Sequence, residues 1–129
     1  MPSLVYAGIL GFLGVALGAF GAHGLEGWLS TLPDGAKRLG WWHTGVQYQL
    51  WHALLLVGIG LWRRAGDTKA LRVASALVLA GCVLFSGSLF AMTLSGIKIL
   101  GAVTPFGGLA FLGAWACVVV AALPGRPGN

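Results

Sequence analysis

The sequence predicts an all-α integral membrane protein, a bundle of four transmembrane helices with both termini in the cytoplasm. Three observations predict this fold class. Of the 129 residues, 57% are hydrophobic and 9% are charged, and the mean hydropathy is +0.87. Four apolar runs reach the ~20 helical residues that cross the ~30 Å hydrocarbon core, and most lysines and arginines lie in the connections between them. The spans are expected at about residues 4–22, 43–61, 73–94 and 105–123 of a single domain, residues 1–129.

The first span carries a ladder of glycines. At ~100° per residue the ladder occupies one sector of a helix, which a neighbouring helix can approach closely. In and just after the third span, small residues recur every seven positions at Ala74, Gly81, Ser88 and Ser95, a pattern typical of a close helix crossing. We therefore predict close helix packing at Gly11, Gly14, Gly18, Gly21 and Gly81.

The second span has aromatic residues at both ends, as membrane helices have at the two interfaces. Trp41 and Trp42 precede this span and Trp62 follows it. From Trp42 to Trp62 a helix rises ~30 Å, which matches the hydrocarbon core. Upstream, Pro33 and Asp34 indicate a helix start. This helix is therefore expected to begin before the membrane does.

The fourth span opens with Thr104 at the N-cap and Pro105 at the first helical position. Gly107 and Gly108 leave its first turn bare. The free N–H groups, the helix dipole and Lys98 nearby in the sequence would suit an anionic group such as a lipid headgroup. The alternative is a tight helix start whose glycines admit another helix.

The distribution of positive charge predicts the orientation. One side of the membrane receives Arg63, Arg64, Lys69, Arg72 and Arg126, and the other receives Lys37, Arg38 and Lys98. This bias favours cytoplasmic termini in a bacterial inner membrane. The net charge of +5 then reflects topology and contact with anionic lipids. We expect membrane lipids as partners and no nucleic acid, with a homo-oligomer or a membrane-protein partner as open alternatives.

Four runs of the chain resemble the YgdD/YwdK family of small membrane proteins. They are residues 18–23 (Gly-Ala-Phe-Gly-Ala-His), Thr44 and Gly45 with Tyr48, Gln49 and His52, residues 84–89 (Leu-Phe-Ser-Gly-Ser-Leu), and Thr104 and Pro105 with Gly107, Gly108 and Trp115. The resemblance covers nearly the whole chain. It implies a four-helix inner-membrane protein and brings no assigned biochemical function. Phe90 stands where the resemblance leads us to expect a tyrosine.

The polar residues of the spans concentrate in the outer half of the membrane. His52 lies ten residues past Trp42 and is therefore expected ~15 Å deep, near the midplane. We predict an outer-leaflet polar pocket that binds a lipid, another small amphipathic ligand or a partner helix. Its residues are His52, Gln49, Tyr48, Thr44, Ser86, Ser88, His23, Thr104, Gly107 and Gly108. The alternative is a small transporter or channel subunit with a pathway along Tyr48, Gln49 and His52.

An ionisable residue inside the membrane is a functional hypothesis by default, and two interpretations of His52 stay open. In the first, a neutral imidazole has both nitrogens hydrogen-bonded and holds the bundle in register. In the second, the imidazole is a proton relay or a ligand contact.

No pattern typical of a catalytic site is found in the sequence. The acidic residues Glu26, Asp34 and Asp67 all lie in predicted loops, and there is no nucleophile–base pair, carboxylate pair or phosphate-binding loop. We therefore predict a protein that is not an enzyme with conventional acid–base machinery. Cys82 and Cys117 lie well inside spans, where a thiol is expected to be a small apolar packing residue.

Metal and haem sites were weighed and are not predicted. His23 and His43 lie near the outer interface with Glu26 one turn beyond His23, but their spacing matches no recognised metal site. Haem ligation needs two imidazoles at one depth, and His23 and His52 differ too much in depth. The sequence therefore predicts no metal and no cofactor.

Overall fold

The computed structural model describes residues 2–125, which form four helical rods and, within that range, no strand. The first rod joins α1 (Pro2–Phe20), a π-helical turn η1 (Gly21–Leu25) and α2 (Glu26–Leu29). The second rod is α3 (Gly35–Ala65). The third joins α4 (Lys69–Gly81), a second π-helical turn η2 (Cys82–Ser86) and α5 (Gly87–Ser95). A 3-10 turn, η3 (Lys98–Ala102), leads into the fourth rod, α6 (Thr104–Ala122). The all-α prediction is confirmed for these residues.

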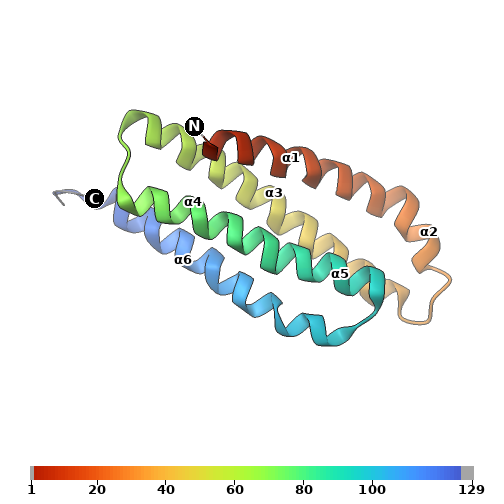
Figure 1. Cartoon of the computed structure of the whole chain (residues 1–129). Helices are drawn as coiled ribbons and strands as arrows, with labels where there is room; N and C mark the ends of the chain where they lie inside the picture. Colours follow the sequence, from red (N-terminus) through yellow and green to blue (C-terminus); the bar gives the residue numbers. More distant parts are fainter. Residues whose placement is uncertain (1, 126–129) are drawn as a thin grey trace.

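The rods lie side by side in a simple order (Figure 1). α1 packs on α3, α3 packs on α5, η2 and α4, and α6 packs on α4 and η2. We call the end where α1 begins and α6 ends the terminal end, and the end that holds residues 30–34 and 96–103 the distal end. Because α6 is held mainly by the third rod, α3 and α6 approach each other chiefly through their long side chains.

By length and composition, three of the rods could cross a membrane: Pro2–Leu29, Lys69–Ser95 and Lys98–Ala122. These rods contain the first, third and fourth predicted spans. α3 is less apolar because it carries polar side chains such as Gln47, Gln49 and His52. The α3 helix is present and begins at Gly35, ahead of residue 43 as expected, but its passage through the membrane stays a prediction.

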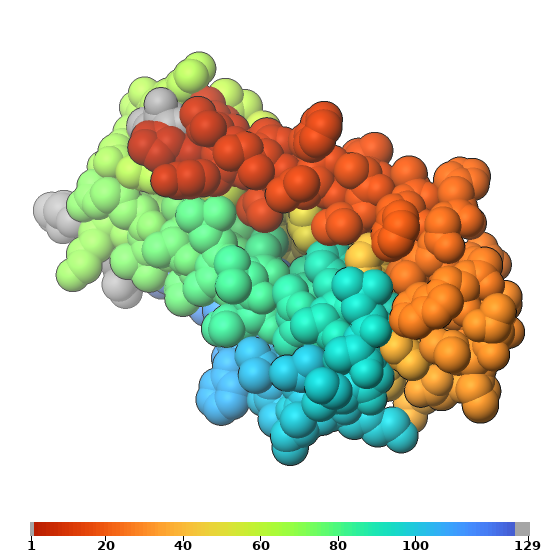
Figure 2. Space-filling model, turned by 45° about the vertical axis from the view of Figure 1, so that its right-hand side comes forward, coloured from red at the N-terminus to blue at the C-terminus, as the bar shows by residue number. Residues whose placement is uncertain are grey.

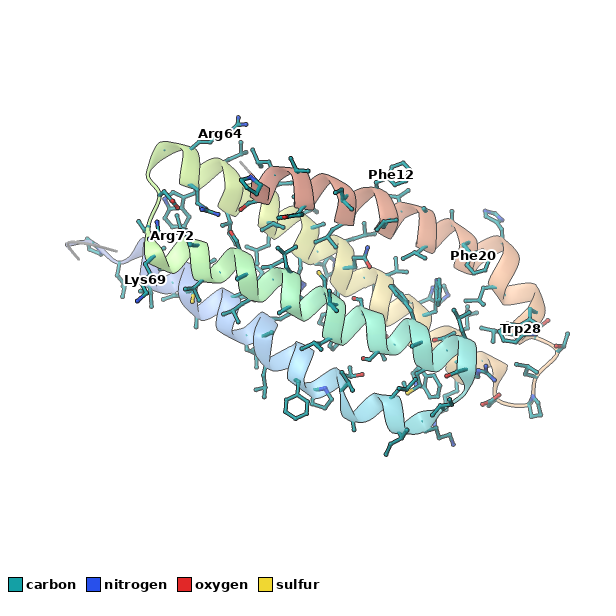
Figure 3. The ribbon with its side chains drawn as sticks, viewed as in Figure 1. Phe12, Phe20, Trp28, Arg64, Lys69 and Arg72 are labelled. Atoms are coloured by element: carbon teal, nitrogen blue, oxygen red, sulfur yellow. The ribbon has the colours of Figure 1, made fainter. Side chains whose placement is uncertain are left out.

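The outer rods present apolar side chains to their surroundings. Val5 and Phe12 on α1 and Leu109 and Leu112 on α6 are exposed. Phe12 points away from the bundle in Figure 3, and Figure 2 shows the first rod uncovered along one face of the molecule. A large apolar surface of this kind is typical of contact with lipid.

Three glycines of the predicted ladder receive side chains of α3: Gly14 receives Leu50, Gly18 receives Val46 and Gly21 receives Trp42. A Cβ on Gly21 would lie 2.6 Å from Trp42 Cδ1, well inside van der Waals contact. Gly11 differs, because no such neighbour lies within 4 Å of a Cβ built on it. Gly81 lies against the ring of Phe111 of α6. In the third rod, too, a glycine therefore receives a large side chain of a neighbouring helix.

The two π-helical turns, which each add one residue to a helical turn, were not predicted from the sequence. In η2 the N–H of Gly87 donates to the carbonyl of Cys82, five residues back, and η1 is closed in the same way. Ser86 of η2 faces α3, where its hydroxyl donates to the Gly45 carbonyl at 2.7 Å. Phe85 of η2 faces α6. The wider turn therefore contacts both neighbouring rods.

At the distal end, Arg38 of α3 caps the last turn of α5. Its Nε donates to the Thr93 carbonyl at 2.8 Å and its Nη2 to the Leu94 carbonyl at 3.2 Å. In return, Thr93 Oγ1 donates to the Arg38 carbonyl at 3.0 Å. A cation at this position offsets the negative end of the helix dipole, and Gly96 then ends the helix in the left-handed region at φ 72°. Arg38 is only 8% exposed, so it is not the loop charge that the sequence suggested.

At the terminal end, Arg63 of α3 links three rods. Its Nε donates to Asp67 Oδ1 at 2.7 Å and its Nη1 to Ser3 Oγ at 2.8 Å. Ser3 Oγ in turn donates to Ser75 Oγ of α4 at 3.2 Å. The hydrogen bond from Arg63, with that from Arg72 and the charges of both, holds the pKa of the exposed Asp67 below its ordinary value. This network ties the start of α1 to the α3–α4 connection.

Candidate functional site

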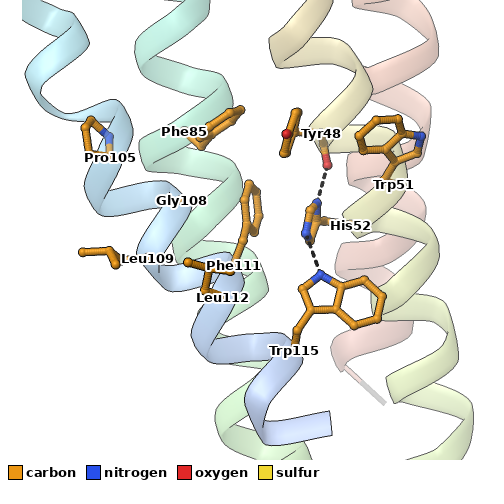
Figure 4. Close-up of a pocket in the computed structure, with 10 residues that line it drawn as sticks. All are labelled: Tyr48, Trp51, His52, Phe85, Pro105, Gly108, Leu109, Phe111, Leu112 and Trp115. Carbon is orange, nitrogen blue, oxygen red and sulfur yellow. Dashed lines mark hydrogen bonds between the residues drawn. The ribbon is translucent and has the colours of Figure 1, made fainter. Parts of the chain in front are cut away.

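A groove of about 750 Å³ lies between α3 and α6, with η2 behind it (Figure 4). Ten residues line it. Six of them carry aromatic rings, namely Tyr48, Trp51, His52, Phe85, Phe111 and Trp115, and the others are Pro105, Gly108, Leu109 and Leu112. The volume lies in the range of small-molecule sites, which are also mostly apolar with a few polar groups. None of these ten side chains carries an acidic or permanently cationic group.

His52 forms the floor of the groove and joins α3 to α6. Its Nδ1 lies 2.7 Å from the Tyr48 carbonyl, and the indole Nε1–H of Trp115 donates to its Nε2 at 3.2 Å (Figure 4). A carbonyl can only accept and an indole N–H can only donate, so these partners assign a neutral imidazole with its proton on Nδ1. The ring also stacks on Phe111, with centroids 3.7 Å apart. Both nitrogens are therefore occupied, which corresponds to the first of the two sequence interpretations, with Trp115 as the unforeseen partner.

Tyr48 lies one helical turn nearer the distal end than His52, and its hydroxyl oxygen is a polar atom at the groove. Its ring packs against Phe85 and Trp51, with centroids 4.5 and 5.2 Å away. Among the hydrogen bonds within residues 2–125, none involves the Tyr48 hydroxyl, and that oxygen is not sealed from its surroundings. Figure 4 shows the Tyr48 and Phe85 side chains facing each other on the distal side of His52.

The start of α6 forms the distal mouth of the groove. Gly107 lies against the backbone of Phe85, so any side chain at position 107 would collide with η2. The glycines thus admit the third rod. Thr104 does not cap α6, contrary to the sequence prediction. Its hydroxyl lies 2.6 Å from Ser88 Oγ instead, because a hydroxyl partner on the neighbouring rod is within reach.

The structure does not gather the predicted polar residues into one pocket. Tyr48, His52 and Gly108 line the groove. Gln49 faces the opposite rod, where its Nε2 donates to the Leu10 carbonyl of α1 at 2.9 Å, and His23 is exposed at the distal end. The Thr44 and Ser86 hydroxyls donate to the backbone of α3, and Ser88 pairs with Thr104. Polar groups in an apolar bundle take the nearest backbone or hydroxyl partner, which scatters them over several interfaces.

Sequence reasoning missed most of the groove wall. Phe111 and Trp115 were not assigned to the pocket, although Trp115 is part of the family resemblance. With Gly108 and Leu112 they follow a helical period of three to four along α6, a stripe that could have been found in the sequence. Within residues 2–125, no three histidine, cysteine, aspartate or glutamate side chains gather in a way that could hold a metal ion.

The groove has the length of one membrane leaflet. On α6 its lining runs from Pro105 to Trp115, and ten residues of α-helix rise ~15 Å. This is half of the ~30 Å hydrocarbon core. The groove therefore has room along its axis for one extended hydrocarbon chain from a single leaflet.

Comparison with known proteins places these observations in a family. The family described as Protein of unknown function (DUF423) matches residues 17–108. The UPF0382 membrane protein YwdK of Bacillus subtilis is 48% identical over 121 residues, which cover 93% of this chain and 94% of YwdK. The UPF0382 inner membrane protein YgdD of Escherichia coli K12 is 41% identical over 120 residues, 93% of this chain and 88% of YgdD. No solved structure matches the chain.

Proposed function

Because this chain belongs to the DUF423 family of UPF0382 membrane proteins and is a multi-pass inner-membrane protein, we propose that it is a non-enzymatic lipid-binding protein. The α3–α6 groove holds one hydrocarbon chain of a membrane lipid. The observation that carries the proposal is the groove itself, which is one leaflet long, rich in rings and without a charged side chain.

The proposal includes four membrane spans, with α3 as the second. α3 has 31 residues, which rise ~46 Å and exceed the hydrocarbon thickness. It packs between α1 and the third rod, both apolar enough to span. The polar groups of Gln49 and His52 are bonded to α1 and α6, and the exposed Gln47 lies nearer the distal end. Low apolarity is therefore compatible with a span, because little of its polar surface would meet lipid.

We further propose cytoplasmic termini. Arg64, Lys69 and Arg72 are exposed at the terminal end, where Figure 3 shows them together. At the distal end the guanidinium of Arg38 is turned into the bundle. Exposed cations remain there at Lys37 and Lys98, so three exposed cations at the terminal end stand against two at the distal end, a bias in the same direction as the sequence count. Arg126, which belongs to the same sequence argument, lies outside the described residues.

Lipid already in a bilayer gains no hydrophobic free energy by entering the groove, so binding has to come from shape and packing. The aromatic walls favour this, because rings offer large rigid contact surfaces. The geometry gives less support to a transport pathway along Tyr48, Gln49 and His52. Gln49 faces α1 while the other two residues face α6, so the three do not line one passage.

The test fills the groove. A Cβ on Gly108 would contact Phe85 at an ordinary 4.0 Å, so Gly108→Leu can be accommodated while its side chain occupies the groove. Gly8→Leu is the matched control, because Gly8 is exposed on α1 with no atom within 4 Å of its Cβ. The measurement is tightly bound phospholipid per protein after detergent purification, by quantitative lipid mass spectrometry.

We expect Gly108→Leu to lose at least about five-fold of the tightly bound lipid and Gly8→Leu to keep it. Leu112→Trp, which fills the groove from an exposed position, should give the same loss. Equal lipid retention in wild type, Gly108→Leu and Leu112→Trp, with all three folded, would overturn the proposed function. A crosslink from the groove to a second protein chain instead of lipid would overturn it as well.

A further inference from the structure

We infer that the groove recognises the acyl ester of a glycerolipid, and that the Tyr48 hydroxyl donates a hydrogen bond to the ester carbonyl. This inference rests on the proposed function and adds the chemical class of the ligand. Neither the family description nor the names of the relatives assigns a ligand or a binding residue.

The first step is the state of the Tyr48 hydroxyl. The other span hydroxyls near it have partners: Thr44 donates to the Gly40 carbonyl, Ser86 to the Gly45 carbonyl, and Ser88 pairs with Thr104. Tyr48 has none within residues 2–125 and faces an apolar space. A hydroxyl without a partner is costly where water is scarce. An acceptor oxygen on the ligand removes that cost.

The second step is depth. The Tyr48 ring packs on Phe85 with centroids 4.5 Å apart, and a Cβ built on Gly108 would lie 4.0 Å from the same ring. They therefore lie at one level, which is four residues or ~6 Å below the start of α6 at Thr104. α6 has 19 residues and rises ~28 Å, about the thickness of the hydrocarbon core. The Tyr48 ring is thus about one helical turn inside the distal edge of the core, close to the level at which a glycerolipid has its esters.

The third step is the path of the chain. From Gly108 the groove continues to Trp115, seven residues or ~10 Å farther along α6. It ends at the bond between His52 and Trp115, which closes the floor. An acyl chain whose carbonyl meets Tyr48 would run down this length, and its headgroup would lie beyond the mouth at Thr104.

The fourth step is charge. A free fatty acid would place its carboxylate at the level of Tyr48, yet none of the ten lining residues is a lysine or arginine. The one titratable base among them, His52, has both nitrogens bonded. An ionised group in such surroundings is strongly disfavoured. The neutral ester carbonyl needs only one neutral donor, which the Tyr48 hydroxyl supplies. The groove therefore favours the ester over the ionised acid.

The experiment compares two lipids that differ only in their ester carbonyls. Delipidated full-length protein is incubated with an equimolar mixture of ester-linked phosphatidylglycerol and its ether-linked analogue of equal chain length, and the bound ratio is read by native mass spectrometry. Tyr48→Phe keeps the ring and removes the hydroxyl. Tyr6→Phe is the matched control, because Tyr6 is exposed on α1 away from the groove.

We expect wild type and Tyr6→Phe to prefer the ester lipid about five-fold, the factor that one net hydrogen bond supplies, and Tyr48→Phe to bind the two lipids equally. A wild-type ratio of one, or an ester preference that survives in Tyr48→Phe, would overturn the inference. If lipid is nevertheless lost in Gly108→Leu, the proposed function stands and only the ester assignment fails. If Gly108→Leu retains lipid as wild type does, both fail.

Discussion

Replacing Trp115 with phenylalanine removes the indole N–H that bonds His52 while leaving a ring of similar shape on α6. The bond is 3.2 Å long and is one of few direct links between α3 and α6. Hydrogen bonds between membrane helices contribute about 0.6 kcal/mol on average and up to about 1.7 kcal/mol. His52 Nε2 would then be a buried acceptor without a donor, which adds a desolvation cost. We therefore expect a loss of about 1–2 kcal/mol, or about 3–8 °C in Tm.

His52→Ala should cost more, about 3–4 kcal/mol, because it removes both hydrogen bonds and the stack on Phe111 and leaves a cavity. It should also reduce retained lipid, since the floor of the groove opens. Trp51→Phe is the control for loss of an indole. Trp51 lines the same groove, is 53% exposed and has no indole acceptor among the described residues, so its Tm should change by less than about 2 °C.

The assay is thermal unfolding in detergent, followed by a thiol-reactive dye. Cys82 is 4% exposed and becomes reactive on unfolding, and a Cys117→Ala background removes the more accessible thiol. The decisive comparison is a double-mutant cycle. If the bond is real, Trp115→Phe lowers Tm in the wild-type background and has almost no effect when His52 is already alanine. An equal Tm loss in both backgrounds would refute the reasoning.

Three further outcomes follow from the packing and the charges. Gly21→Leu should destabilise the protein by about 1–3 kcal/mol, since its side chain would overlap an indole of α3, whereas Gly11→Leu, in open space, should leave Tm unchanged; equal Tm values would contradict the packing. The lowered pKa of Asp67 means that its stabilising effect is complete above the ordinary aspartate pKa and is lost as pH falls through the lower folded value. Tm should therefore hold from pH 8 to about pH 5 and decline below about pH 4, and Asp67→Asn should reduce that decline. Finally, an impermeant maleimide added to intact cells should label Lys98→Cys and not Lys69→Cys; the reverse pattern would invert the proposed orientation.

Much of the helical framework could be predicted from the sequence. Apolar runs of sufficient length gave four helices close to the observed ones, and the glycine ladder identified the face of α1 that meets α3 at Gly14, Gly18 and Gly21. Gly11 was wrongly counted among the packing positions. A helical period shows which residues share a face of the helix, but it does not show over what length a neighbouring helix contacts that face. The π-helical turns were missed, since they depend on the fit between rods and have no local sequence signature as clear as a proline.

The candidate site was predicted in part. Tyr48 and His52 were singled out by polarity at membrane depth, and both line the groove. Polarity also led to the prediction that Gln49 and Ser86 belong to the pocket. Their side chains instead donate hydrogen bonds to the carbonyls of Leu10 and Gly45. A sequence shows which groups need partners and cannot show which partner is nearest.

The helices, their apolar character and the positions where backbones can approach follow from the amino-acid sequence alone, because they depend on side chains within one or two turns of each other. What those helices enclose depends on their packing in three dimensions. The groove exists because Gly107 lets α6 rest on Phe85 while Trp115 reaches His52, contacts between residues 22 and 63 positions apart. Such pairs are set by how four rods pack in three dimensions, and a pattern read along one chain does not contain that arrangement.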